Sequence, residues 1–416
     1  MNIVRITGWL ATTVLAVAVG LSSLVIANQS KNPAISIALG FGPQGSAKAN
    51  LAVAAYSARV TRNPKAAVTA AERGMARDAY RNEPLSPTAV GIIAASMRRP
   101  AEARQREALL DLAGRLSRRN SLVAMQILEV ASLNDDSRKF FTWLSRLITT
   151  NDERRTLYVG AMADATARED SVEALVPVIG QTPPWEETYW LQVVRRPASL
   201  VNAARVRIGI AGKPWEQTAI KTTDRDLALK LAEIGEFDTA RRLGVALGQS
   251  VAEGRAGGSL LINGNFSRLP QLPPLDWELT ALGNLGASIS PKEKTLAISA
   301  IGGARGIAAR QLIRLPSGHY SFGWTQSSTA PFAPGALITR IQCAEPKSAP
   351  LTGTTIPLVA GKRVAQVQIP ADDCMWRWIS IQVAVADDSA GIDAILRNLS
   401  LVSAGGGAVQ DSSRRP

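Results

Sequence analysis

The chain has little of the chemistry that enzymes and metal sites use. Its 416 residues include one His and two Cys, and aromatic residues make up only 5%. Zinc sites need several thiolate or imidazole ligands, and His is the commonest catalytic acid or base. We also find no P-loop, dinucleotide fingerprint, nucleophile elbow or zincin pattern. The sequence therefore predicts no cofactor and no metal site, and it favours a non-enzymatic protein.

Charge is plentiful and unbalanced, with a net charge of +13 that is not gathered into long basic runs. A basic surface suits nucleic acid, anionic lipid or an acidic polymer. No nucleic-acid-binding motif is present, and the N-terminal segment described next leads the chain out of the cytoplasm. We therefore expect no nucleic-acid partner, and lipid head groups or an acidic polysaccharide are better matched.

The N-terminus holds one long uncharged stretch. Residues 9–27 contain no charged side chain, and about 20 such residues can span a bilayer as a helix. Arg5 precedes the stretch, which favours a cytoplasmic N-terminus. We predict that residues 1–28 form a single-pass inner-membrane anchor and that the bulk of the chain is periplasmic. The alternative is a cleaved signal peptide, which gives the same compartment.

The two cysteines fit an oxidising compartment. Cys343 and Cys374 both lie in the C-terminal region, 31 residues apart. In such a compartment the pair is expected to form one disulfide, whereas the alternative is two free buried thiols.

The middle of the chain has the texture of short helices. We expect residues 29–46, rich in Asn, Gly and Pro, to be a linker and residues 47–256 to be helical. The clearest pair is DRDLALKLAEIGEFDTARRLGVAL at 224–247, with a break at Gly235. It resembles a tetratricopeptide repeat, a helix pair of about 34 residues. The resemblance implies an α-solenoid whose groove docks protein partners, and the alternative is a plain helical bundle.

Aromatic residues also cluster within this helical region. Trp185, Tyr189 and Trp190 fall at helical spacing within WEETYWLQVV. Such spacing is more typical of packing than of a ligand site, so we predict that all three belong to the core.

After residue 256 the pattern changes to short β-rich runs, and we predict a domain over 257–405 followed by a disordered tail at 406–416. The runs alternate apolar and polar residues and are separated by Gly and Pro: SLLINGNF, TLAISAI, ARQLIRL, HYSFGW, LITRIQC, RVAQVQI, WRWISIQVAV and AILRNLSL. Eight such runs predict an antiparallel sandwich or jelly roll.

Several of these segments resemble carbohydrate-binding modules of the jelly-roll type. They are LLINGNFS at 260–267, LPPLDWEL at 272–279, LPSGHYSFGW at 315–324 and AILRNLSLV at 394–402, which resemble the family's opening, following, middle and closing strands. The resemblance implies sugar binding on aromatic platforms, in some members with a structural calcium ion. Arg397 stands where the family has Asp, which argues against calcium.

The segment CMWRWISIQVAV contains the candidate sugar site. Alternation places Met375, Ile379, Ile381 and Val383 on a face that is expected to join the core, with Arg377 interrupting it. The opposite face holds Trp376, Trp378, Ser380 and Gln382. Two indoles beside polar groups suit a half-exposed stacking surface, so Trp376, Trp378 and Gln382 are the predicted carbohydrate-binding residues. The alternative is that both indoles are buried, as large aromatic side chains usually are.

The predicted protein is multidomain, with an N-terminal transmembrane helix, an all-α tetratricopeptide-like solenoid and an all-β jelly-roll sandwich. We interpret it as an envelope scaffold that docks protein partners and binds glycan, and by analogy one that acts in extracellular polysaccharide assembly or export. One alternative is a protein assembly factor without sugar binding, which burial of both indoles would favour. Another is a carbohydrate-active enzyme, although no pair of carboxylates facing across a cleft can be identified.

Overall fold

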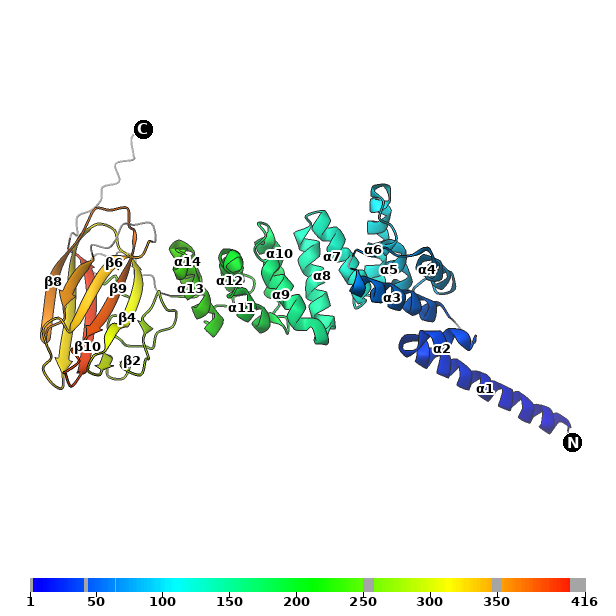
Figure 1. The fold of residues 1–416 in the computed structure, drawn as a ribbon, viewed down its shortest axis with the longest axis horizontal. Coiled ribbons are helices and arrows are strands. Elements are labelled where there is room, and N and C mark those ends of the chain that lie inside the picture. Colours follow the sequence, from blue (N-terminus) through cyan, green and yellow to red (C-terminus); the bar gives the residue numbers. More distant parts are fainter. Residues whose placement is uncertain (1–2, 41–43, 64, 250–257, 346–352, 405–416) are drawn as a thin grey trace. The chain divides into compact units, whose positions relative to one another are not determined.

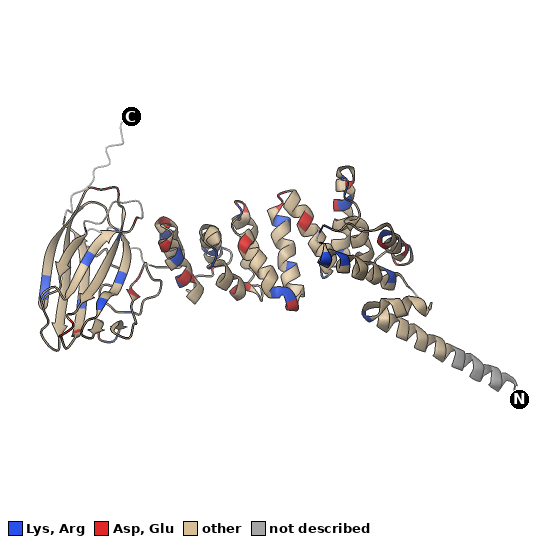
Figure 2. Cartoon of the chain, viewed as in Figure 1, with Lys and Arg blue, Asp and Glu red and all other residues tan. Residues whose placement is uncertain are grey.

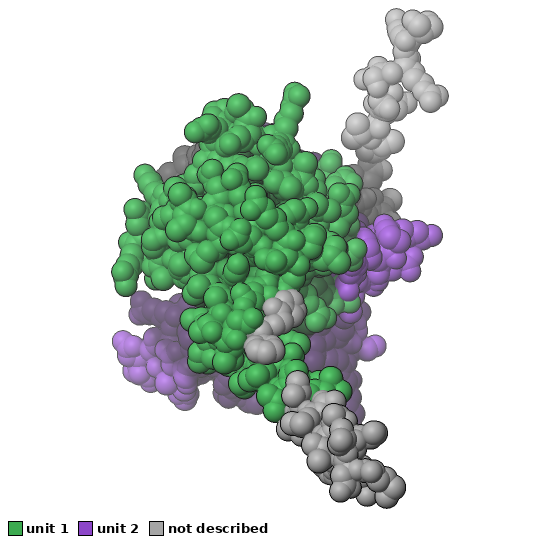
Figure 3. All heavy atoms as spheres, turned by 90° about the vertical axis from the view of Figure 1, so that its right-hand side faces the viewer, with its two compact units in different colours: residues 1–162, 173–178, 182–188 green, residues 163–172, 179–181, 189–416 purple. Residues whose placement is uncertain are grey.

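The computed structural model describes residues 3–40, 44–63, 65–249, 258–345 and 353–404, with side chains from residue 15 onward. The chain divides into two compact units, coloured in Figure 3. Unit 1 comprises residues 1–162, 173–178 and 182–188, and unit 2 comprises 163–172, 179–181 and 189–416.

Helices fill the first 250 residues (Figure 1). After α1 (Ile3–Lys31) and α2 (Pro33–Ala38) they are α3 (Gly45–Arg62), α4 (Ala70–Asn82), α5 (Pro87–Ala95), α6 (Ala103–Leu116), α7 (Ser121–Leu133), α8 (Ser137–Thr150), α9 (Arg155–Ala165), α10 (Ser171–Ile179), α11 (Glu186–Val193), α12 (Leu200–Ala211), α13 (Thr222–Glu233) and α14 (Phe237–Ala246). From α3 on they form successive pairs. Four of the five intervals between the first helices of neighbouring pairs fall between 31 and 36 residues, close to the period of helix-pair repeats.

The stretch predicted as a linker, 29–46, is partly helical. Helix α1 continues to Lys31, and α2 follows after a single residue. The Ser36 hydroxyl donates a hydrogen bond to the backbone oxygen of Val25 at 3.2 Å, and both residues are buried. The linker prediction was therefore wrong over these residues, because Pro33 stands at a first helical position, where its missing N–H costs nothing.

The membrane helix predicted for residues 9–27 is not supported. None of the helices, as far as their residues are described, combines the length and apolar character needed to cross a membrane. The side chains of residues 9–14 lie outside the described part of the segment.

Charged residues of both signs are interspersed along the helices, as Figure 2 shows. The +13 net charge is therefore not concentrated on one helix, in line with the absence of long basic runs in the sequence.

Helix α4 begins at a capping box. The Glu72 backbone N–H donates to the Thr69 hydroxyl at 3.2 Å, and the Thr69 N–H donates to the Glu72 carboxylate at 2.8 Å. Arg59 of α3 donates two hydrogen bonds to the same carboxylate, at 3.0 and 2.5 Å. One buried carboxylate thus caps α4 and ties it to α3.

This arrangement predicts an acid-sensitive contribution to stability. Burial acts to raise the pKa of the Glu72 carboxyl, but hydrogen bonds from Arg59 and Thr69 outweigh it, and the pKa lies below its ordinary value of 4.5. A lowered folded-state pKa stabilises the protein above pH 4.5, and this contribution disappears as the pH falls through the folded pKa. We expect Glu72→Gln to lower the melting temperature of the protein at pH 7 but to lower it progressively less below pH 4.5. A difference between the two melting temperatures that does not change with pH would contradict this.

The helix pair singled out in the sequence is present as α13 and α14. Gly235 lies between them with φ of +81°, a left-handed conformation that glycine adopts without strain. Apolar residues of both helices are buried: Ala228, Leu231, Ala232, Phe237, Ala240 and Leu243. The predicted helix–turn–helix is confirmed.

The aromatic cluster of the helical region is also confirmed as core. Trp185, Tyr189 and Trp190 are each no more than 2% exposed. Within unit 2, the Tyr189 hydroxyl lies 3.1 Å from the Thr166 hydroxyl, so its polar end has a partner inside the core.

Two five-stranded antiparallel sheets form the C-terminal sandwich (Figure 1). The strands are β1 (Glu278–Leu279), β2 (Leu285–Ser290), β3 (Thr295–Ala300), β4 (Arg305–Arg314), β5 (Gly318–Ser328), β6 (Leu337–Cys343), β7 (Thr354–Pro357), β8 (Gly361–Ile369), β9 (Trp376–Ala384) and β10 (Ile392–Ser403). One sheet, here the β9 sheet, has the order β1-β4-β9-β6-β7, and the other, the β10 sheet, has the order β2-β3-β10-β5-β8. Their facing sides enclose the core, which includes Phe266, Trp277, Phe322, Ile379 and Leu396.

Seven of the eight predicted runs are strands, and the first is not. Residues 260–267, expected to open the sandwich, form turns, because Asn263 and Phe266 have φ values of +54° and +53°. Residues other than glycine rarely adopt this conformation within a strand. Two strands without a strong alternating pattern were missed, β2 and β7, whereas β1 lies at the end of the segment 272–279 that resembles a strand of the family.

Helix α14 packs against the sandwich inside unit 2. Gly244 of α14 faces Leu275, which would lie 2.9 Å from an added Cβ atom, and the Gln249 amide donates to the Gln271 side chain at 3.0 Å. The division between the two compact units falls within residues 162–189, whereas the sequence predicts a domain boundary at 256.

Candidate functional site

The predicted disulfide is present. Cys343 at the end of β6 is bonded to Cys374, which precedes β9. Next to it, the Glu345 carboxylate accepts hydrogen bonds from the backbone N–H groups of Met375 and Trp376, at 2.8 and 3.3 Å. The chain around the disulfide is thus fixed where strand β9 begins.

Strand β9 alternates largely as predicted. Ile379, Ile381 and Val383 are buried in the core. Arg377 is also buried, and its guanidinium donates to the backbone oxygens of Leu315 and Cys374. Met375, which was expected in the core, is 38% exposed because it precedes the strand.

Of the two indoles predicted to bind sugar, Trp376 is buried. It is 5% exposed, and its ring centroid lies 5.8 Å from that of Phe237 at the start of α14. The surface of two adjacent indoles expected from the sequence is therefore not formed, because a helix covers one of them.

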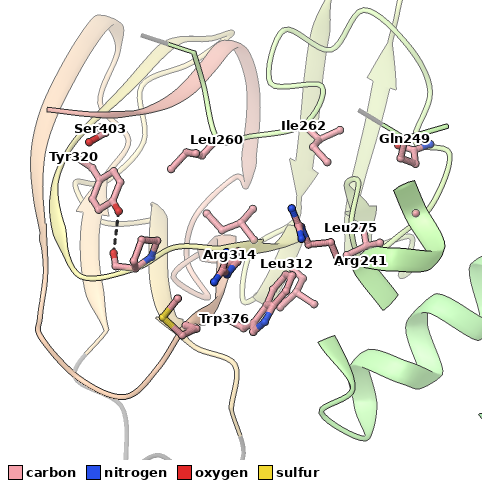
Figure 4. Close-up of a pocket in the computed structure, with 14 residues that line it drawn as sticks. Arg241, Gln249, Leu260, Ile262, Leu275, Leu312, Arg314, Tyr320, Trp376 and Ser403 are labelled. Atoms are coloured by element: carbon pink, nitrogen blue, oxygen red, sulfur yellow. Dashed lines mark hydrogen bonds between the residues drawn. The ribbon is translucent and has the colours of Figure 1, made fainter. Parts of the chain in front are cut away.

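Trp376 also lines a cavity of about 560 Å³ between α14 and the sandwich (Figure 4). Leu275 and Leu312 form apolar parts of its wall, and the polar parts include Arg241 and Arg314. Burial raises the pKa of the Tyr320 hydroxyl, another part of the wall, which donates to the backbone oxygen of Pro316 at 2.9 Å.

Trp378 is the indole that remains partly exposed. It points away from the core, on the outer face of the β9 sheet, between Leu312 of β4 and Gln342 of β6. The guanidinium of Arg310 lies 4.4 Å from its ring centroid, at a cation–π distance. Gln382, the third predicted residue, is half-buried on the same face, and its amide donates to the Ser380 hydroxyl at 3.0 Å.

Two arginines on this outer face stand on either side of Ser380. Antiparallel pairing aligns one residue from each strand across the whole β9 sheet: Glu278, Arg310, Ser380, Arg340 and Thr355. Ser380 is small and buried, so the two guanidinium groups flank a low point of the face. Trp378 lies two residues before Ser380 on β9 and Gln382 lies two residues after it, so both side chains are on the same face as Ser380.

The two arginines differ in their partners. Arg310 donates two hydrogen bonds to the Glu278 carboxylate, at 2.7 and 3.0 Å. The Arg340 side chain makes no ion pair or hydrogen bond with any residue of the described ranges, and its Nε atom is buried without a partner. Arg340 therefore presents an uncompensated cation on this face.

Arg310, Arg340 and Gln342 were not identified from the sequence. Each lies on a strand that neighbours β9, and only the register places them beside Trp378 and Ser380. Alternation within β4 and β6 could have predicted that these side chains point outward. It could not have predicted the order of the strands, which places them beside β9. No group of His, Cys, Asp and Glu side chains able to hold a metal ion occurs among the described residues.

No family model and no curated protein matches this chain. Among solved structures, one described as "CBM4 structure and function" is 16% identical and covers 34% of this chain and 99% of its own, with a TM-score of 0.27. TmCBM61 in complex with β-1,4-galactotriose is 11% identical and covers 35% and 98%, with a TM-score of 0.25. A family 16 carbohydrate-binding module is 18% identical and covers 30% and 90%, with a TM-score of 0.22. Each match covers about a third of this chain.

Proposed function

We propose that the protein is a non-enzymatic scaffold whose sandwich binds a glycan on the outer face of the β9 sheet. One observation carries this proposal: a half-exposed indole, Trp378, lies on a sheet face among two guanidinium and two amide side chains. Sugars offer apolar C–H surfaces together with many hydroxyl groups. An indole can contact the first, and planar donors and acceptors can bind the second.

The helical part supports a docking role. Four of the five intervals between its helix pairs are 31 to 36 residues long, close to the period of tetratricopeptide repeats. Stacked pairs of this kind commonly bind other proteins along a groove, so we propose protein partners for this part of the chain.

The compartment is proposed from the disulfide. Disulfides such as Cys343–Cys374 persist mainly in oxidising compartments. From the disulfide we propose that the bulk of the protein lies in the periplasm, where it takes part in the assembly or export of a polysaccharide.

A second candidate, a protein assembly factor without sugar binding, is favoured by one specific observation. Trp376 is covered by Phe237 of α14, so this part of the predicted sugar site serves to pack a helix against the sandwich. Under this alternative Trp378 and its neighbours would form a protein contact.

Replacing Trp378 by Ala tests the two candidates. We expect the full-length variant to bind the host's own envelope polysaccharide at least about 30-fold more weakly, because a partly exposed indole at the centre of a site typically carries about 2 kcal/mol of binding energy. Affinity would be measured by isothermal titration calorimetry or by affinity electrophoresis. Ile395→Ala, a half-buried outward position on the β10 sheet, is the matched control and should bind normally. Unchanged binding by a folded Trp378→Ala variant would contradict the proposal.

A further inference from the structure

We infer that the glycan bound by the β9 sheet is acidic and that Arg340 binds its carboxylate group. This inference rests on the proposed function and adds the chemical class of the ligand. On this face Arg310 is paired with Glu278, whereas Arg340 has no acidic partner among the described residues.

The charge on this face is unbalanced. Among the outward-facing residues of the five strands, Glu278 is the one carboxylate, and both of its oxygens accept hydrogen bonds from Arg310. Within the described residues, Arg340 pairs with no acid. The segment 346–352, which follows β6 in the chain, contains no Asp or Glu. Among the described residues, the cation at Arg340 is therefore left to solvent or to a bound ligand.

The surroundings of Arg340 determine which of its N–H groups a ligand can reach. Its Nε atom is buried and has no acceptor in the described structure. Because this atom is buried, a ligand would bind the terminal N–H groups of the guanidinium. Part of the Arg340 side chain is exposed, so a ligand lying on the sheet can reach the guanidinium.

The position of Arg340 relative to Arg310 suits an extended ligand. The two residues lie on strands either side of β9, both directly opposite Ser380. Strands are spaced about 4.8 Å apart, so the two backbones are separated by about 10 Å across a low point made by a buried serine. A saccharide crossing the strands here would meet Arg340 at one end, Arg310 at the other and Trp378 along one side.

The guanidinium group favours a carboxylate over other ligands. Its planar N–H groups match the two oxygens of a carboxylate in a bidentate pair, which is stronger and more directional than a hydrogen bond to a neutral hydroxyl. Uronic acids carry this group at a fixed position on each sugar ring. A polymer of uronic acid thus provides both the anion for Arg340 and the apolar ring surface for Trp378.

The test compares three uronate polymers, polygalacturonate, alginate and hyaluronan, each with its carboxyl-reduced form, using the full chain. We expect at least one native polymer to bind tenfold or more tightly than its reduced form, since a hydrogen bond to a charged partner is worth about that factor. Arg340→Gln should remove this difference, and Arg340→Lys should restore part of it. Arg397→Gln is the matched control, because Arg397 is a half-buried outward arginine on the β10 sheet.

The outcomes separate this inference from the proposed function. Equal binding of native and reduced polymers, unaffected by Arg340→Gln but lost in Trp378→Ala, would overturn the acidic ligand and leave glycan binding in place. No binding of any of the three polymers in either form would overturn the acidic ligand, and the proposed function would then be decided by the binding of the host's own polysaccharide. Thermal unfolding of each variant shows whether a loss of binding reflects a loss of folding.

Discussion

Asp224→Ala is expected to destabilise the last three helices of unit 2 by about 3–5 kcal/mol. Arg207 and Asp224 are 1% and 2% exposed and form a bidentate pair at 2.7 and 3.1 Å. The Arg207 guanidinium also donates to the backbone oxygens of Gln217 and Ala219, which fixes the loop between α12 and α13. Removing the carboxylate leaves a buried cation without its counter-charge.

Hydrogen exchange of the amides in α12 and α13, followed by mass spectrometry, measures this local loss directly. Two variants serve as controls. Glu233→Ala breaks the exposed pair with Lys230 and should cost less than about 1 kcal/mol. The double replacement Arg207→Met with Asp224→Leu should cost less than Asp224→Ala alone, because it removes both charges together. If Asp224→Ala exchanged like the wild type, the pair would have no structural role.

Loss of the disulfide is expected to lower the stability of the sandwich by roughly 3–4 kcal/mol. Cys343 and Cys374 are 31 residues apart, and the bond restricts the unfolded chain by closing that loop. The bond also fixes the segment in which Glu345 accepts hydrogen bonds from the start of β9. The measurement is thermal unfolding of the wild type with and without a reductant.

The Cys343→Ser/Cys374→Ser variant is the control for this experiment. It should unfold at the lower temperature whether or not a reductant is present, and the reduced wild type should match it. A reductant effect of equal size in the variant would show that the wild-type change does not come from this bond.

Much of the fold could be predicted because local patterns and tertiary packing agree. Alternating runs predicted seven strands, and Gly235 between two apolar helix faces predicted α13 and α14. The prediction of a first strand was wrong because Asn263 and Phe266 adopt positive φ values. The residue types at these positions do not reveal this conformation. Helix α2 was missed because six residues show too little periodicity to be recognised.

The site could be predicted only in part. Alternation correctly placed Trp376, Trp378 and Gln382 on the outer side of β9. It could not show that Phe237, more than a hundred residues earlier, covers Trp376. The two arginines that flank Ser380 depend on the order β4-β9-β6, and strand order in a sandwich is a long-range property. The sequence therefore predicted the strand at the centre of the proposed site, whereas the neighbouring strands that complete it required the structure.

Hydroxyl-radical footprinting of the full chain, with and without bound polysaccharide, shows whether the outer face of the β9 sheet is the ligand surface. We expect oxidation of Trp378 to fall on binding. Val364, which is 64% exposed on the edge strand of the β10 sheet, should be oxidised to the same extent in both states. Protection confined to the helices or to the β10 sheet, with Trp378 oxidised equally in both states, would contradict this expectation.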